Sequence, residues 1–453
     1  MASATMQAMR AAARRMYVSL LPLETRERLW MYRHKHYWNE WQAPPISPQY
    51  LIERERSVRR LQQLMARQAE YKGVVVFPPS VLWDIPLFQR PQQMARAFAQ
   101  LGYLVIYWEG TQVARRKYQI REVSQNIYAV RMPAQALATI SKPLAISYTY
   151  NYNWVKRLTD PTVVYEFIDH LDIFTNFPRP SLEDHHAQLL KCARLVVATA
   201  DDLLEAVKPD RPDAILAPNA ADYALFGAAS ADTAIPQDMQ ALVAEGKPII
   251  GYYGALAEWF DYDLIHALAQ TMADCAFVLI GPPYDDSVAT TSLGDLPNVY
   301  LLGQRDYSSL PGYLQTFSVA TIPFKLSEAI QAVSPIKLFE YMAGGKPVVT
   351  SDMAECRKYP EVLIARSPDE WVSQLRHAIA LHDDEEYLAR VRLRGLQNTW
   401  EARAQTILDA LHPASDPASD AGTVGAENDK TVEQRAAYTP VQSQSSSAHV
   451  AEG

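Results

Sequence analysis

Cysteine and long hydrophobic runs are both scarce in this sequence. Its 453 residues include three cysteines, which lie far apart at Cys192, Cys275 and Cys356. Such spacing indicates neither a disulfide framework nor a C-x-x-C pair, so we expect buried structural thiols in a reduced, cytoplasmic protein. No apolar run reaches the roughly 18 residues that span a membrane. The stretch 16–23 is interrupted by serine and proline and has no clear cleavage site, so we expect no signal peptide.

An excess of basic residues and the common metal and phosphate-loop motifs are also missing. The formal net charge is −8, and a nucleic-acid-binding protein would need a basic surface, so we expect no nucleic-acid partner. The sequence contains neither G-x-x-x-x-G-K-[ST] nor H-E-x-x-H. His185 and His186 are adjacent and would point to different sides of a helix, so we expect no metal pair there. Nothing else in the sequence requires a metal, and we expect no cofactor.

The length predicts two domains plus extensions, because one domain usually takes roughly 100–200 residues. Short apolar runs alternate with amphipathic stretches, first from residue 74 and again from residue 248. Runs of about four to six apolar residues, many of them β-branched, are typical of strands buried on both faces. The predicted strands are 74–77, 104–108, 145–148, 163–168, 195–199, 215–217, 248–253, 277–280, 299–302, 319–322, 348–350 and 362–364.

This alternation predicts an α/β protein with two Rossmann-like domains, whose parallel sheets face a central cleft. Ligands are expected in that cleft, because open α/β sheets bind them outside the carboxyl ends of the strands. The last segment has too few apolar residues to offset its ordering entropy and is expected to be disordered. The predicted parts are a helical extension (1–72), a first Rossmann-like domain (73–222), a linker (223–246), a second Rossmann-like domain (247–383), a helical segment that returns to the first domain (384–412) and the tail (413–453).

One segment, SPIKLFEYMAGGKPVVT from residue 334 to 350, combines a helix start with groups that bind phosphate. Its serine suits an N-cap and its first proline the first helical position, and the helix should end at the two glycines. The free amides of the first turn and the lysine would hold a diphosphate, while the glutamate would bind both ribose hydroxyls. The alternative is a capped core helix with an exposed lysine and glutamate. The predicted donor-binding residues here are Ser334, Pro335, Ile336, Lys337 and Glu340.

The same segment resembles the signature of GT-B glycosyltransferases, in particular of glycosyltransferase family 4. That family has two glutamates spaced E-x7-E before an A-x-G-x-P-V-V run, which this sequence matches from Ala343 to Val349. The resemblance implies that Glu340 is the second glutamate, which binds the nucleotide ribose. The first glutamate, which contacts the donor sugar, would fall at Ala332. Glu328, four residues earlier, is the candidate to replace it.

Other stretches of both domains share this resemblance. The loop that contains Gly254 resembles the glycine-containing loop that approaches the donor phosphates, where glycine permits close contact. The Arg and Lys-Gly that often follow in the family are absent, so we expect Lys337 to be the main cation for the diphosphate. Arg305 lies in the loop where such enzymes hold the base, and Trp400 in a segment that resembles the closing helix of the family.

Acceptor and catalytic residues are expected in the first domain. Residues 83–93 resemble a subgroup of bacterial surface-polysaccharide glycosyltransferases, which makes Asp84 and Arg90 candidates for holding hydroxyl and phosphate groups of an acceptor. Asp169 and His170 follow a buried strand, where α/β enzymes place functional groups, and they are the catalytic candidates. The alternatives are a plain helix start near Arg90 and a helix cap at Asp169.

The resemblance implies an enzyme that moves a hexose-like sugar from a nucleoside-diphosphate sugar to a hydroxyl of a glycan or lipid-linked acceptor, in cell-surface polysaccharide or glycolipid synthesis. Retention of the anomeric configuration and catalysis without a metal are implied in the same way. Two alternatives stay open. One is a nucleotide-sugar epimerase with the GT-B fold. The other is a catalytically weak subunit of a polysaccharide assembly complex, which Ala332 and the missing basic residues favour.

The first 41 residues combine arginines with several tryptophans. Basic residues beside interfacial aromatics suit an anionic membrane surface, so residues 1–41 are expected to contact the inner face of the plasma membrane. The alternative is that these aromatic residues pack on the enzyme itself.

Overall fold

The computed structural model describes residues 48–85, 88–109, 118–132, 134–174, 177–227 and 234–412. The predictions for residues 1–41 and for the tail 413–453 lie outside the described residues.

The first sheet has eight strands in the order β3-β4-β2-β1-β5-β6-β7-β8, and all neighbours are parallel except the β3–β4 pair. Its central strands are buried along their whole length because they consist of Val, Ile, Leu and aromatic residues. The strands are β1 (Val74–Phe77), β2 (Leu104–Trp108), β3 (Gln119–Ser124), β4 (Ile127–Arg131), β5 (Leu144–Ser147), β6 (Thr162–Phe167), β7 (Leu195–Ala198) and β8 (Ile215–Leu216).

The second sheet has six strands in the order β11-β10-β9-β12-β13-β14, and every pair is parallel. Its order reverses direction at β9, so the loops after β9 and β12 leave the sheet at a switch point, where α/β proteins bind ligands. The strands are β9 (Ile249–Tyr253), β10 (Ala276–Ile280), β11 (Val299–Gly303), β12 (Val319–Ile322), β13 (Val348–Ser351) and β14 (Leu363–Ala365).

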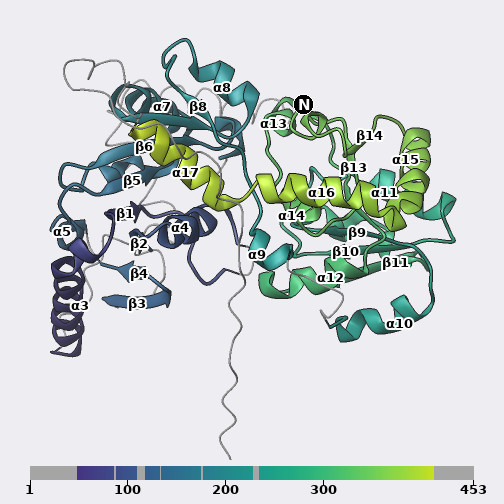
Figure 1. The fold of residues 1–453 in the computed structure, drawn as a ribbon, viewed down its shortest axis with the longest axis horizontal. Helices are drawn as coiled ribbons and strands as arrows, with labels where there is room; N and C mark the ends of the chain where they lie inside the picture. Colours follow the sequence, from purple (N-terminus) through teal and green to yellow (C-terminus); the bar gives the residue numbers. More distant parts are fainter. Residues whose placement is uncertain are drawn as a thin grey trace, which may run out of the picture. The chain divides into compact units, whose positions relative to one another are not determined.

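The last two helices, α16 (Glu385–Gln397) and α17 (Trp400–Leu411), follow one another directly (Figure 1). Helix α16 packs on α14 (Ile336–Ala343), whereas α17 packs on α4 (Arg90–Gln100) and buries Trp400 beside residues of the first sheet. The other α-helices of the described residues are α3 (Pro48–Ala66), α5 (Ala134–Leu137), α6 (Tyr152–Val155), α7 (Arg179–Cys192), α8 (Asp201–Val207), α9 (Tyr223–Phe226), α10 (Gln240–Ala244), α11 (Tyr262–Thr271), α12 (Leu310–Thr316), α13 (Glu328–Gln331) and α15 (Pro368–Ala380).

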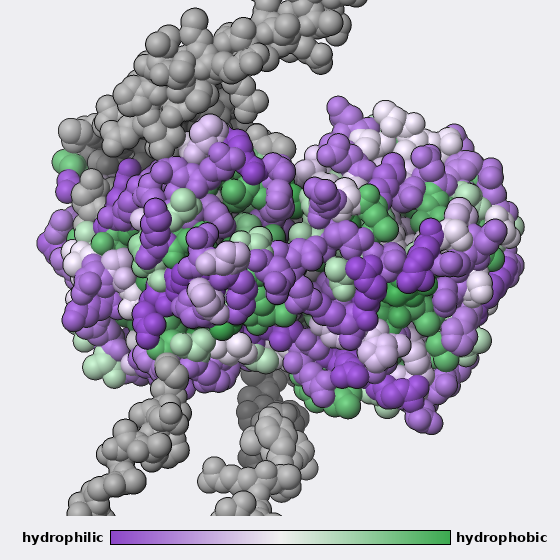
Figure 2. All heavy atoms as spheres, turned by 90° about the horizontal axis from the view of Figure 1, so that it is seen from above, coloured by the Kyte–Doolittle hydropathy of each residue, from purple (hydrophilic) through white to green (hydrophobic). Residues whose placement is uncertain are grey.

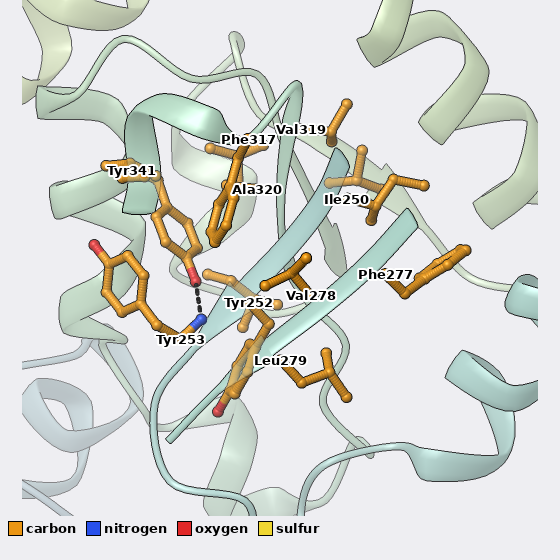
Figure 3. Packing of buried hydrophobic residues seen from close by; sticks show 14 of the residues in the cluster. Ile250, Tyr252, Tyr253, Phe277, Val278, Leu279, Phe317, Val319, Ala320 and Tyr341 are labelled. Carbon is orange, nitrogen blue, oxygen red and sulfur yellow. Dashed lines mark hydrogen bonds between the residues drawn. The ribbon is translucent and has the colours of Figure 1, made fainter. Parts of the chain in front are cut away.

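The core of the second sheet is aromatic as well as aliphatic (Figure 3). In this core the Tyr341 hydroxyl, on α14, accepts a hydrogen bond of 3.0 Å from the backbone amide of Tyr253 on β9. That bond fixes α14 against the end of β9. The face of the molecule in Figure 2 is mostly hydrophilic, with hydrophobic residues scattered in small groups.

The predicted α/β architecture with two mainly parallel sheets is confirmed, and each predicted strand is present to within one residue at either end. The sequence reading missed the antiparallel hairpin of β3 and β4, because β3 is half exposed and carries mostly polar side chains. All three cysteines are free, but Cys192 is exposed because it is the last residue of the surface helix α7, so the prediction of a buried thiol is wrong there.

Candidate active site

Helix α14 begins one residue later than the sequence predicts. Pro335 is the N-cap and Ile336 the first helical residue, so the prediction that Ser334 caps the helix is wrong. The Ser334 hydroxyl instead accepts a 3.1 Å hydrogen bond from the backbone amide of Asn219, and the Asn219 side chain donates to the Ser334 carbonyl at 2.6 Å. A tertiary contact has therefore replaced the local cap.

The C-terminal end of α14 lies where the two glycines predict it. Gly344 is the C-cap, and Gly345 has a φ of 66°, a conformation that glycine adopts without strain. The amides of Gly345 and Lys346 donate to the carbonyls of Met342 and Tyr341, which is the Schellman arrangement. The helix is thus fixed at both ends, and so is the direction of the side chains on it.

Glu340 is buried, with 3% of the residue exposed. Its Oε1 atom accepts a hydrogen bond of 2.9 Å from the Tyr307 hydroxyl, and among the described residues no hydrogen bond reaches Oε2. Burial raises the pKa of this carboxyl to about 7, while the hydroxyls of Tyr307 and Tyr253 and the charge of Lys337 lower it. The Tyr253 hydroxyl is close enough to act on this pKa, although it makes no hydrogen bond of normal geometry to a described residue.

Lys337 lies against the loop that follows β9. A Cβ atom built on Gly254 would come within 2.8 Å of Lys337 Cε, so this close contact requires glycine, which here has a φ of 145°. The ammonium lies 4.8 Å from the ring centre of Phe324 and 5.4 Å from that of Tyr252. Part of the side chain reaches the surface, yet the protein around the ammonium lowers its pKa to about 8. No hydrogen bond or ion pair of Lys337 is found within the described part of the chain.

The loops after β9 and β10 approach each other at two glycines. A Cβ atom on Gly281 would lie 1.7 Å from the carbonyl oxygen of Gly254, so no side chain fits there. The amide of Gly254 donates to the Ile280 carbonyl, and that of Gly281 to the Gly303 carbonyl. These bonds join the ends of three neighbouring strands into one backbone surface beside Lys337.

Arg305 forms its polar contacts with residues other than Glu340. Its guanidinium forms an ion pair of 2.6 Å with Asp238 and donates to the Tyr313 hydroxyl at 2.7 Å. Its loop still reaches the site, because Tyr307 lies two residues further on and bonds Glu340.

Ala332, at the position expected for the first glutamate of the family motif, is packed among hydrophobic residues. Ala332 is 5% exposed and belongs to a buried hydrophobic cluster whose other members come from residues 61–214. Glu328 starts the short helix α13 and is exposed, so it does not occupy the space at Ala332.

The two catalytic candidates differ in their surroundings. Asp169 follows β6, and burial raises the pKa of its carboxyl to about 7, while Arg90 lowers it. Within the described ranges its carboxylate makes no hydrogen bond, so it does not cap a helix. His170 is exposed, and its Nδ1 atom lies 3.0 Å from Asp172 Oδ2. Asp169 is thus the group held in a protein environment, and His170 faces solvent.

Both acceptor candidates, Arg90 and Asp84, form ion pairs with other residues of the protein. Arg90 is 3% exposed and forms an ion pair of 2.7 Å with the fully buried Glu166. Its other donors bind the Pro218 carbonyl and the Asn219 side chain. Asp84 is exposed and pairs with Arg121.

A polar cavity of about 450 Å³ lies beside the loop after β9 and is lined partly by Glu258, Asp263, His266 and Lys325, but by none of the predicted donor residues. No group of three or more His, Cys, Asp or Glu in the described ranges is arranged to hold a metal ion. None of the helices that the structure describes is both long and apolar enough to cross a membrane.

Sequence reasoning missed the partners that define these environments, namely Gln93, Glu166, Tyr253 and Tyr307. Gln93 and Tyr307 are 214 positions apart and touch only in the folded chain. The one local signal was the position of Tyr307 in the loop expected at the base.

Comparisons with known proteins agree with this architecture. Residues 247–380 match the family "Glycosyl transferases group 1". The Bacillus subtilis (strain 168) protein TuaH, named as a teichuronic acid biosynthesis glycosyltransferase, is 25% identical over 247 residues. That alignment covers 52% of this chain and 61% of TuaH, which is less than two thirds of the relative.

Solved structures are similar over a larger share of the chain. A sucrose-phosphate synthase from Thermosynechococcus elongatus has a TM-score of 0.56 at 15% identity, covering 74% of this chain and 97% of that one. A trehalose-6-phosphate structure from E. coli bound with UDP-2-fluoro glucose has a TM-score of 0.57 at 13% identity, covering 76% of this chain and 99% of that one. Anabaena HepE in complex with UDP and glucose has a TM-score of 0.54 at 15% identity, covering 75% of this chain and 99% of that one. These likenesses show that the chain has the GT-B fold.

Proposed function

We propose that this protein is a glycosyltransferase that moves a sugar from a nucleoside-diphosphate donor to a hydroxyl acceptor. The premise is the GT-B fold together with the group 1 glycosyl transferase match over residues 247–380. The observation that carries the proposal is Lys337, whose ammonium has no hydrogen-bond or ion-pair partner among the described residues. It lies beside the glycine loop, one turn from the buried carboxylate Glu340.

The donor diphosphate is assigned to Lys337 and the backbone around Gly254 and Gly281. A partly buried ammonium without an ion-pair partner is stabilised by an anion, and the glycines leave room for phosphate oxygens. Glu340 has one carboxylate oxygen free of hydrogen bonds to described residues, and this oxygen is assigned to the ribose hydroxyls. We assign no direct donor contact to Arg305, because Asp238 and Tyr313 already hold it.

In the proposed reaction the acceptor oxygen bonds to the anomeric carbon, and the bond from that carbon to the diphosphate breaks. Lys337 stabilises the charge that develops on the leaving diphosphate, which is a large term in group transfer. The proton of the acceptor hydroxyl must leave at the same time. Asp169 is the proposed recipient of this proton, because its carboxyl has no hydrogen bond to a described residue and a pKa of about 7.

On the acceptor side, Arg90 is proposed to position other groups rather than to touch the acceptor. It holds Glu166 and the Pro218–Asn219 turn, and Asn219 in turn binds Ser334 at the start of α14. Asp84 is exposed and remains a candidate for acceptor contact at the surface.

A hexose donor with a uridine diphosphate is the proposed substrate class, since two neighbours of the same fold are described with UDP-2-fluoro glucose and with UDP and glucose. The TuaH likeness supports a role in cell-surface polysaccharide synthesis. A place on the inner face of the plasma membrane is proposed on the basic and aromatic residues of 1–41 alone. Retention of the anomeric configuration is proposed on the family resemblance alone.

A second candidate, a nucleotide-sugar-binding subunit with little turnover, is favoured by one observation. The position of the first glutamate holds the buried Ala332, and the nearest acidic replacement, Glu328, faces solvent. Slow turnover with normal donor binding is the behaviour that would favour this alternative.

Donor turnover separates these possibilities. The purified protein is incubated with UDP-, GDP- and TDP-hexoses, with and without a lipid-linked acceptor mixture, and released diphosphate and products are measured by mass spectrometry. Glycosyl transfer predicts diphosphate release and an acceptor gain of one hexose, whereas an epimerase changes the sugar without an acceptor. Absence of both binding and release for every donor would contradict the proposal. NMR of the product linkage tests retention.

A further inference from the structure

Three side chains connect helix α4 with the carboxylate proposed to hold the donor ribose. Gln93 Nε2 donates a hydrogen bond of 2.7 Å to the Tyr307 hydroxyl, and this hydroxyl donates one of 2.9 Å to Glu340 Oε1. Gln93 belongs to α4, beside the first sheet, while Tyr307 and Glu340 follow strands of the second. Resting on the proposed function, we propose that Tyr307 is a positioning residue that couples α4 to the donor carboxylate Glu340.

The direction of both hydrogen bonds follows from the chemistry of the three groups. An ionised carboxylate only accepts hydrogen bonds, and a phenol has a single proton, so Tyr307 donates that proton to Glu340. The hydroxyl oxygen can then accept only from a donor, and the amide NH₂ of Gln93 supplies one. Gln93 therefore holds the hydroxyl in the orientation that favours an ionised Glu340.

The ring of Tyr307 is enclosed by aromatic neighbours. Phe88 stacks on it with ring centres 5.6 Å apart and planes at 21°, and Phe226 meets it edge to face at 5.6 Å. The residue is 9% exposed. A ring packed in this way is not available to stack on a nucleotide base, so its hydroxyl carries the role.

The hydroxyl matters because burial opposes the ionised form of Glu340. Besides Tyr307, the groups that act on the carboxyl are Tyr253 on β9, Lys337 on α14 and Asp222, the N-cap of α9. Asp222 lies 3.5 Å from Arg96, on α4. The arginines of α16, which packs on α14, form ion pairs with other carboxylates: Arg390–Glu386, Arg392–Glu385 and Arg394–Glu361. Loss of the Tyr307 bond would therefore favour protonation of Glu340 at neutral pH.

The test measures UDP binding by calorimetry between pH 5.5 and 8.5. Tyr307→Phe should move the pH at which binding is half-maximal upward by about one pH unit, because a hydrogen bond to a charged group is lost. Gln93→Met should move it in the same direction by less, and should add nothing in the Tyr307→Phe background. The ionisation of UDP itself is common to all variants.

Tyr313→Phe is the matched control, since the Tyr313 hydroxyl binds Asp238 and Arg305 rather than Glu340. It should leave the pH of half-maximal binding unchanged. An unchanged value for Tyr307→Phe, or additive effects of the Gln93 and Tyr307 substitutions, would overturn the coupling.

A measurement without ligand separates this inference from the proposed function. Unfolding temperatures of wild type, both single variants and the double variant are compared at pH 5 and pH 8. Coupling predicts non-additive effects at pH 8, where Glu340 is ionised, and weaker ones at pH 5. Non-additive unfolding in a protein that binds no nucleoside diphosphate would overturn the donor site but support the link. Additive unfolding at both pH values would overturn the link itself.

Discussion

Replacing Lys337 by methionine should stabilise the ligand-free protein while it weakens binding of a nucleoside diphosphate. Methionine keeps much of the length of the side chain and carries no charge. The lysine pKa of about 8, against an ordinary 10.5, corresponds to at most about 3.5 kcal/mol of destabilisation, at about 1.4 kcal/mol per pH unit. Because part of the side chain reaches the surface, we expect Lys337→Met to gain about 1–2 kcal/mol.

The pH dependence of this gain has a defined sign. Below pH 8 Lys337 is charged in both the folded and the unfolded chain, and the folded chain is then destabilised in full. As the pH rises from about 8 to 10.5, the folded form loses its proton first and the destabilisation disappears. The advantage of Lys337→Met should therefore be largest below pH 8 and should vanish near pH 10.5.

Thermal unfolding with and without UDP measures both effects. At an unfolding entropy of about 2 cal/mol/K per residue, the gain corresponds to about 1–3 °C in the ligand-free protein. UDP should bind roughly 10- to 100-fold more weakly, because a charge-assisted bond to phosphate is lost, and its stabilising shift should shrink accordingly. Uridine, which has no phosphate, should bind as before.

Lys346→Met is the control, because Lys346 also has a pKa lowered to about 8 by burial but lies beyond the other end of α14. It should leave UDP binding unchanged. A ligand-free Lys337→Met protein that melts lower than wild type would refute the argument from burial. Equal losses for UDP and uridine would refute the phosphate contact.

Three other predictions concern Glu340, Asp169 and residues 1–41. Glu340→Gln should weaken UDP binding about 10- to 100-fold in calorimetry. Because the pKa of the Glu340 carboxyl is raised to about 7, the wild-type protein should lose stability as the pH rises from 4.5 through 7. The same loss of stability in Glu340→Gln would contradict this assignment. Asp169→Asn should lower turnover about 100-fold with UDP affinity nearly unchanged, while His170→Asn, the exposed neighbour, should change little. Full-length protein should sediment with anionic vesicles at low salt, and a form without residues 1–41 should not; equal sedimentation of both would exclude that anchor.

The sequence predicts those parts of this protein whose cause is local. Strands such as β1 and β2 lie at the predicted residues because runs of β-branched and aromatic side chains are stable only when buried on both faces. The end of α14 was predictable for a similar reason, since Gly345 takes a left-handed conformation that few other residues accept.

What the sequence does not predict depends on contacts between distant segments. Ser334 has the chemistry of an N-cap, but Asn219, 115 positions earlier, binds its hydroxyl instead. Arg90 has the chemistry of a phosphate ligand, but Glu166 on β6 neutralises it. In both cases the residue type indicates a polar partner correctly, and only the fold decides which partner it is.

Three charged groups that burial destabilises in this protein are also groups assigned to the proposed function. Lys337 has a lowered pKa, and Glu340 and Asp169 have raised ones, so burial disfavours the charged form of all three. Groups with perturbed pKa values are frequent at functional sites, where a ligand completes their environment. A nucleoside diphosphate would give Lys337 its counter-charge and Glu340 two hydroxyl donors, so both charged forms would be favoured by the donor itself. With Ala332 in place of a carboxylate, the proposed recognition of the donor depends on Lys337 and Glu340 beside the glycine loop, so their removal should affect binding before it affects the fold.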